Sequence, residues 1–164
     1  STCPTWADFL IDLATVERVY SEVFDGPGVE NGRILQREDL ARISPEWWPE
    51  ARLVPVPCLR LLSLQYPIHD YISAVRHRQE AVIPEPSRTY LVVTRREFIV
   101  RRAAVSRPEY ELLGALMAGE AVGTAIERVT SAPNVDIDTL EQNLPSWFQA
   151  WAAAGYFQTI ECPA

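Results

Sequence analysis

The chain has 164 residues, of which 48% are hydrophobic and 23% charged, and a formal net charge of -7. This composition supplies enough apolar side chains for a packed core and excludes wholesale disorder. No apolar run approaches the ~20 residues that a membrane-spanning helix needs, and no stretch has the order of a signal peptide, so we expect a cytoplasmic protein.

The N-terminal third of the chain predicts a long helix followed by a linker. Apolar residues between Trp6 and Phe24 recur at spacings of three and four, which is typical of an amphipathic helix. The breaker sequence DGPG at 25–28 ends this helix. In the polar linker, Ser44 and the proline that follows it are a typical helix start. We therefore assign residues 1–50 to an N-terminal helix and linker.

The centre of the chain predicts a strand, a helix and a hairpin. Residues 58–66 are mainly apolar and bounded by prolines, as expected for a strand, and residues 67–78 begin with a proline, as a helix often does. Two β-rich segments, 89–93 and 98–102, follow. Because only the short stretch TRRE separates the apolar parts of these segments, we predict that they pair as an antiparallel hairpin.

The rest of the chain is predicted to be mainly helical. The expected helices span residues 106–118, 120–130 and 138–154. Pro145 lies inside the last of these, so we expect a kink or a late start there, and residues 156–160 are predicted as a final strand. The order of strand, hairpin and three helices is that of a winged helix. We therefore predict an α+β fold with a small antiparallel sheet and a winged-helix-like helical bundle over residues 51–164, preceded by the long N-terminal helix.

Four segments of the sequence resemble a known family. The segments are residues 6–28, 58–72, 88–102 and 109–129. They are similar to the C-terminal half, and the helix before it, of the bacterial HvfC/BufC-type family, whose members are often labelled putative DNA-binding proteins. These proteins accompany iron-dependent enzymes that modify cysteines in ribosomally made peptides, and some resemble the partner proteins of methanobactin biosynthesis. The C-terminal half also resembles the PqqD-like winged helix that holds leader peptides.

The resemblance implies a non-catalytic accessory protein. Such a protein would dock on an iron-dependent peptide-modifying enzyme and present the peptide substrate to it. The family's N-terminal helical module has no counterpart here, so its role is not carried over. The chain also opens STCPTW without an initiator methionine, and we expect it to be part of something longer.

The stretch 88–107 contains six arginines and one acidic residue. One interpretation is a solvated sheet edge, on which arginine is an ordinary outward side chain. The other is an anion-binding or partner-binding edge, because guanidinium groups form bidentate pairs with carboxylates or phosphates. The best candidates are Arg95, Arg96, Arg101 and Arg102. We expect Arg95 and Arg96 to be exposed, so that replacing them by alanine leaves folding nearly intact and slows association with a partner.

The charge of the last helix decides between DNA and protein as the partner. No arginine or lysine occurs from residue 129 to residue 164, whereas the same stretch holds four acidic residues. Phosphate neutralisation supplies nearly all non-specific DNA affinity, and a recognition helix needs basic or amide side chains. We therefore expect weak DNA binding or none. A DNA-binding regulator and a structural subunit of a larger assembly remain the alternatives to the accessory protein.

Aromatic residues supply the remaining candidates for a protein interface. Trp47 and Trp48 are adjacent, so one helix or strand cannot easily bury both, and we add them to the partner-binding residues. The face formed by Trp147, Phe148 and Trp151 is more typical of a core.

No pattern of catalytic or metal-binding residues stands out. The two histidines, His69 and His77, lack the spacing of a helical metal pair, and a surface or capping role is favoured. The three cysteines are widely spaced and include no CxxC, which argues against a disulfide framework and a zinc site. A nucleophile elbow and a phosphate-binding glycine loop are also absent from the sequence. We therefore expect a protein that is not an enzyme and that binds no metal ion and no cofactor.

Overall fold

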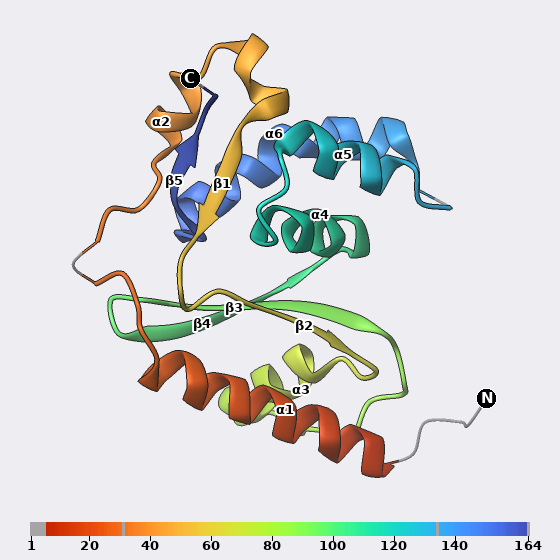
Figure 1. The fold of residues 1–164 in the computed structure, drawn as a ribbon. Helices are drawn as coiled ribbons and strands as arrows, with labels where there is room; N and C mark the ends of the chain where they lie inside the picture. Colours follow the sequence, from red (N-terminus) through yellow and green to blue (C-terminus); the bar gives the residue numbers. More distant parts are fainter. Residues whose placement is uncertain (1–5, 31, 134, 164) are drawn as a thin grey trace. The chain divides into compact units, whose positions relative to one another are not determined.

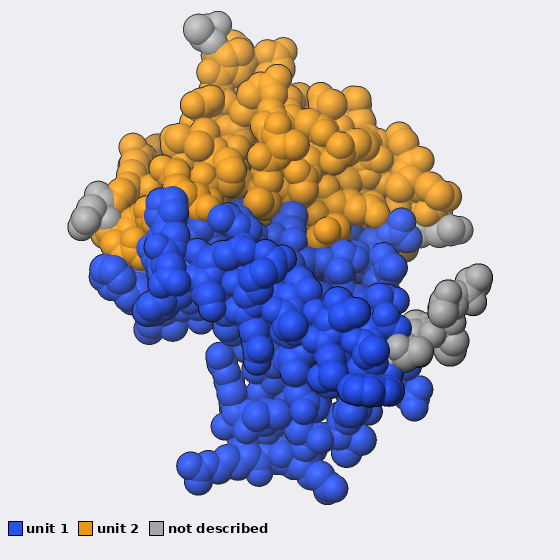
Figure 2. Space-filling view, turned by 60° about the horizontal axis from the view of Figure 1, so that its bottom comes forward, with its two compact units in different colours: residues 1–27, 58–107 blue, residues 28–57, 108–164 orange. Residues whose placement is uncertain are grey.

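The computed structural model describes residues 6–30, 32–133 and 135–163 (Figure 1). By its internal contacts the chain forms two compact units, each assembled from two separate stretches (Figure 2). Unit 1 comprises residues 1–27 and 58–107, and unit 2 comprises residues 28–57 and 108–164. The domain boundary predicted after residue 50 therefore falls inside unit 2.

Unit 1 is a three-stranded antiparallel sheet with two helices. Its elements are α1 (Trp6–Asp25), β2 (Arg60–Leu64), α3 (Ile68–Arg76), β3 (Thr89–Arg96) and β4 (Ile99–Val105). The strand order is β2-β3-β4, so β3 is central and β4 lies at an edge. Helices α1 and α3 lie against the same face of this sheet (Figure 1).

The core of unit 1 forms where α1 packs on the sheet and on the start of α3. Phe9 of α1 meets the rings of Tyr66 and Tyr71 edge to face, at centroid distances of 5.6 and 5.0 Å. Asp12 is also buried, and its carboxylate accepts hydrogen bonds from the backbone N–H groups of Gln65 (2.6 Å) and Tyr66 (2.9 Å). A buried charge is tolerated when it is hydrogen-bonded, so this carboxylate fastens α1 to the end of β2.

The predicted hairpin is confirmed, but its turn lies further along the chain than expected. Residues 94–96, predicted to belong to the connection, continue β3, and Arg96 pairs with Ile99. The loop is therefore the dipeptide Glu97–Phe98, with φ values of 53° and 63°. Two positive φ values are the signature of a type I′ turn, which matches the twist of the strands but favours asparagine and glycine. Neither residue marks this turn in the sequence, which is why its position was missed.

Unit 2 combines helices with a two-stranded antiparallel sheet. Its elements are α2 (Arg37–Ala41), the 3-10 helix η1 (Pro45–Glu50), β1 (Arg52–Pro55), α4 (Arg107–Met117), α5 (Val122–Thr130), α6 (Ile137–Ala154) and β5 (Phe157–Glu161). Helix α4 begins at the boundary between the two units. Strands β1 and β5 pair with each other, with Leu53 opposite Ile160.

Helix α6 ends at Ala154 as predicted and begins at Ile137, one residue before the predicted start. The carboxylate of Asp136 caps it by accepting the N–H of Thr139, and Gly155 ends it in the left-handed conformation with φ 75°. Pro145 does not delay the start of the helix, which runs from Ile137.

The core of unit 2 is centred on Trp151, one of the most buried side chains of the protein. Its ring packs against those of Phe148 and Phe157, and its indole Nε1 donates a hydrogen bond to the Glu109 carboxylate at 3.0 Å. Phe148 is buried as well, so two of the three aromatic residues predicted along this face belong to the core.

The α+β fold class, the small antiparallel sheet and the long N-terminal helix are thus confirmed. Among the described residues, no helix is both long and apolar enough to cross a lipid bilayer.

Candidate functional site

The net charge of the chain is unequally divided between the two units. Unit 1 has 10 arginines against 9 acidic residues, a net charge of +1. Unit 2 has 5 arginines against 13 acidic residues, a net charge of -8. The negative charge of the protein is therefore a property of unit 2, and the arginine-rich hairpin belongs to the unit with almost no net charge.

The outer edge of the three-stranded sheet is formed by β4. In an antiparallel hairpin with a two-residue loop, the residues flanking the loop exchange main-chain hydrogen bonds, and this pattern then alternates along the strand. Because Arg96 pairs with Ile99, the main-chain N–H and C=O groups of Val100, Arg102 and Ala104 point away from β3. Among the described residues, main-chain hydrogen bonds outside the helices and strands do not involve residues 99–105. The edge of β4 thus offers a row of main-chain donors and acceptors to an incoming strand.

Large apolar side chains are exposed at the tip of the hairpin. Phe98 is 71% exposed and Ile99 is 54% exposed. Glu97 and Phe98 also hold left-handed backbone conformations, which carry a steric cost for residues with a Cβ atom. Arg101 follows on β4 and is exposed. An exposed apolar tip beside an exposed cation is typical of a protein-binding surface.

The expectation that Arg95 is exposed is wrong. Its side chain is only 7% exposed, because it lies on the sheet face covered by α1. The guanidinium Nη1 donates to the carbonyl oxygen of Val23 at 2.9 Å and also to that of Phe24. These carbonyls belong to the last turn of α1, where helix partners are missing and a positive charge is favourable. Arg95 therefore caps α1, and its replacement by alanine is expected to disturb folding.

Arg102 is also engaged within unit 1. Its guanidinium donates to the Tyr20 hydroxyl (2.8 Å), the Ser73 hydroxyl (2.9 Å) and the His69 carbonyl oxygen (3.2 Å). It thereby connects β4 with α1 and α3. Burial, together with the positive charge of Arg102, lowers the pKa of His69 below its usual value. Arg96 is half-buried at the end of β3, so Arg101 is the one exposed member of the four predicted arginines.

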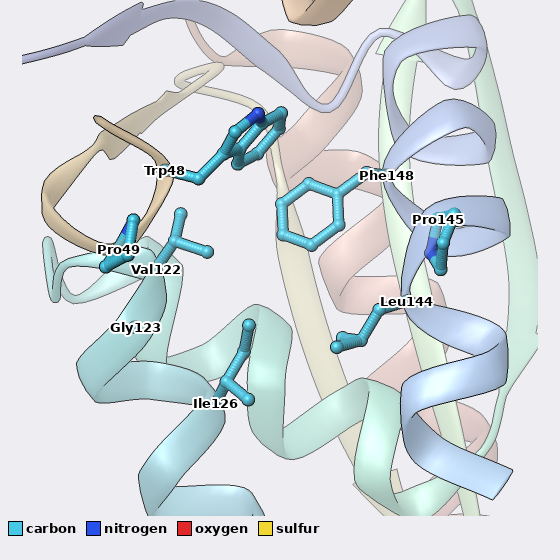
Figure 3. Close-up of a pocket in the computed structure, with 8 residues that line it drawn as sticks. All are labelled: Trp48, Pro49, Val122, Gly123, Ile126, Leu144, Pro145 and Phe148. Carbon is cyan, nitrogen blue, oxygen red and sulfur yellow. The ribbon is translucent and has the colours of Figure 1, made fainter. Parts of the chain in front are cut away.

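Unit 2 contains an apolar groove with a cavity volume of about 390 Å³. Its walls come from η1, α5 and α6, and its lining residues are Trp48, Pro49, Val122, Gly123, Ile126, Leu144, Pro145 and Phe148. The side chains of Trp48, Ile126, Leu144 and Phe148 point into one shared space (Figure 3). None of the lining side chains is charged, and the Trp48 indole N–H is their one polar group.

A close approach of α5 to η1 shapes this groove. A Cβ atom on Gly123 would lie 2.9 Å from the Pro49 carbonyl oxygen and 3.1 Å from the Pro49 Cα. The N–H of Val122, at the start of α5, donates to the Ala51 carbonyl oxygen at 2.9 Å. Only glycine allows this contact without displacing backbone, and no local sequence pattern indicates it.

The two candidate tryptophans lie on η1, in the other unit from the arginine hairpin. Trp47 is 40% exposed, whereas Trp48 is half-buried and meets the Phe148 ring edge to face at 5.3 Å. Adjacent positions on a short helix thus direct one indole to the surface and the other into the groove. Sequence reasoning identified Trp48 but missed Ile126 and Leu144, because ordinary apolar spacing does not distinguish a groove from a core.

Titratable side chains do not gather into a metal site in the part of the chain that the structure describes. His77 lies at the end of α3, where its Nδ1 is 2.7 Å from the Ser73 carbonyl oxygen. Burial, and secondly the charge of Glu109, raise the pKa of Tyr156 to about 12. This phenol is therefore neutral at physiological pH and belongs to the core of unit 2.

Comparison with models of protein families, with curated proteins and with solved structures finds no match.

Proposed function

We propose that this chain is a non-catalytic, cytoplasmic accessory protein that binds an extended peptide along β4 and presents it to a partner enzyme. Because four sequence segments resemble the HvfC/BufC-type family, we propose an iron-dependent peptide-modifying enzyme as the partner. The winged-helix interpretation of the helices that follow the hairpin is part of the same proposal.

The observation that carries the proposal is the free edge of β4. The main-chain groups of Val100, Arg102 and Ala104 point outward, and they match the spacing of an added antiparallel strand. Such strand addition obtains its affinity from main-chain hydrogen bonds, so it tolerates many peptide sequences. Arg101 beside this edge favours peptides with an acidic residue at the facing position.

The distribution of charge supports a protein partner over DNA. Unit 2, which contains the three helices predicted as a winged-helix bundle, has a net charge of -8. Helix α6 has two acidic residues and no basic one. Because phosphate contacts dominate DNA affinity, a helix of this charge is a poor reader of the major groove.

Substitution of Ala104 by proline tests whether a peptide binds to the main chain at the edge of β4. Ala104 is exposed and its N–H points outward, so Ala104→Pro removes one donor from the edge while leaving the ladder with β3 intact. The matched control Ala104→Val keeps the donor and suits a strand. The probe is a labelled eight-residue peptide of alternating valine and glutamate.

We expect the wild type and Ala104→Val to bind this peptide, and Ala104→Pro to bind at least about fivefold more weakly, since one hydrogen bond contributes roughly 1 kcal/mol. Circular dichroism confirms that each variant is folded. Equal affinity of the proline and valine variants, or no binding by the wild type, would overturn the proposal. The contribution of the exposed arginine to binding is tested separately. Arg101→Ala should slow association of the peptide and reduce the salt dependence of the association rate.

A further inference from the structure

The elements that form the walls of the apolar groove in unit 2 carry mainly acidic charged residues. The three elements that form its walls carry five acidic residues and one arginine: Glu46, Glu50, Glu127, Asp138, Glu141 and Arg128. The arginine is already engaged, because its Nη1 lies 2.6 Å from the Glu120 carboxylate. The three elements around the groove therefore carry a net negative charge.

Two of these carboxylates lie on the groove side of their helices. Glu127 follows Gly123 by four residues, and Glu141 precedes Pro145 by four. Residues four apart share one face of an α-helix. Both side chains are exposed, so they flank the opening from opposite walls.

Pro145 adds a main-chain acceptor to this negative rim. Proline has no N–H, so the carbonyl oxygen of Glu141 lacks the donor that an uninterrupted helix would supply four residues later. A carbonyl in this position can accept a hydrogen bond from a lysine or arginine of a bound molecule.

We propose that this groove docks a basic amphipathic helix of a protein partner. The surface inside the groove is apolar, so it cannot orient a small polar ligand but suits bulky apolar side chains. The partner helix inserts such side chains at positions i, i+4 and i+7, and its flanking lysines or arginines lie beside Glu127 and Glu141. This site does not depend on the β4 edge, so either proposal can fail without the other.

The test uses the whole chain and a synthetic 15-residue amphipathic helical peptide with leucines on one face and lysines beside them. A second peptide replaces every lysine by glutamate. Binding is measured by fluorescence anisotropy of the labelled peptides, and the site is located by the NMR signal of the Trp48 indole N–H.

Four variants separate the apolar and the charge contributions. Leu144→Gln places an amide in the groove, and its control is Ile137→Gln, an exposed position on the same helix outside the groove. The double substitution Glu127→Lys and Glu141→Lys reverses the charge at the rim of the groove. Its control is the pair Glu80→Lys and Glu85→Lys, exposed residues of unit 1 that change the net charge equally.

We expect the lysine peptide to bind, to shift the Trp48 signal, and to bind at least about tenfold more tightly than the glutamate peptide. Leu144→Gln and the rim reversal should each weaken binding roughly tenfold. Leu144→Gln places an amide in the apolar groove, whereas the rim reversal turns the attraction of Glu127 and Glu141 for the peptide's lysines into repulsion. The two controls should bind like the wild type. The proposal is overturned if the lysine peptide does not bind, if both peptides bind equally, or if the control pair weakens binding as much as the rim pair.

Discussion

Replacing Arg95 tests whether a buried guanidinium holds the C-terminal end of α1 on the sheet. Arg95→Ala removes a donor whose Nη1 contacts the carbonyl oxygens of Val23 and Phe24. A hydrogen bond to a charged group contributes about 1.5–3 kcal/mol, and the two acceptors share one nitrogen. We therefore expect a loss of about 3 kcal/mol in the free energy of unfolding. Arg95→Met keeps most of the aliphatic volume, so a similar loss there assigns the effect to the hydrogen bonds.

The matched control is Arg101→Ala on the same hairpin. Its side chain is exposed, and exposed substitutions usually shift stability by no more than about 0.5 kcal/mol. Urea unfolding followed by circular dichroism gives the overall stability. Hydrogen exchange at the amides of Val19 and Val23 reports on unit 1 alone, which matters because two units need not unfold together. If Arg95→Ala and Arg101→Ala have the same stability, the capping role of Arg95 is refuted.

Three further predictions concern buried contacts. Asp12→Ala should lower the free energy of unfolding by about 3 kcal/mol or more, because two backbone N–H groups lose a charged acceptor. In urea titrations Asp12→Asn should lower the free energy of unfolding by less, and an equal decrease in the two variants would contradict this prediction. Gly123→Ala should destabilise unit 2 by about 1–3 kcal/mol through its clash with the Pro49 backbone. An unchanged melting temperature would instead show that η1 can move away from the added Cβ atom without loss of stability. Because the pKa of Tyr156 is raised to about 12, the folded state keeps a proton that the unfolded state loses above pH 10, so stability should fall by roughly 2–3 kcal/mol between pH 10 and 12. The chain has no lysine to titrate in this range, and Tyr156→Phe should remove most of the loss in denaturation curves at pH 9 and 12; an equally steep loss in that variant would exclude Tyr156 as the cause.

The helices and the hairpin were predictable because their signals are local. The apolar spacing of α1, the cap at Asp136 and the stop at Gly155 each act within a few residues. The hairpin was found from its β-rich segments, but its turn was placed too early. Glu97 and Phe98 adopt positive φ without glycine or asparagine, so turn chemistry gave no signal.

The candidate sites were harder to predict because they depend on contacts between distant residues. Arg95 and Arg101 are equivalent in the sequence pattern, yet one caps a helix more than 70 residues away and the other is exposed. The groove likewise needs three separate elements, η1, α5 and α6. Only Trp48 was identified in advance, because a pair of adjacent tryptophans is unusual whatever the fold.

Hydrogen exchange along β4 tests the central claim most directly. In the free protein, the amides of Ile99, Arg101, Ala103 and Val105 should exchange slowly because they bond to β3, whereas those of Val100, Arg102 and Ala104 should exchange fast. The measurement is repeated with the alternating valine–glutamate peptide bound. The account predicts that the three fast amides become protected while the other four change little. Protection that appears elsewhere in the chain, with Val100, Arg102 and Ala104 still exchanging fast, would contradict it.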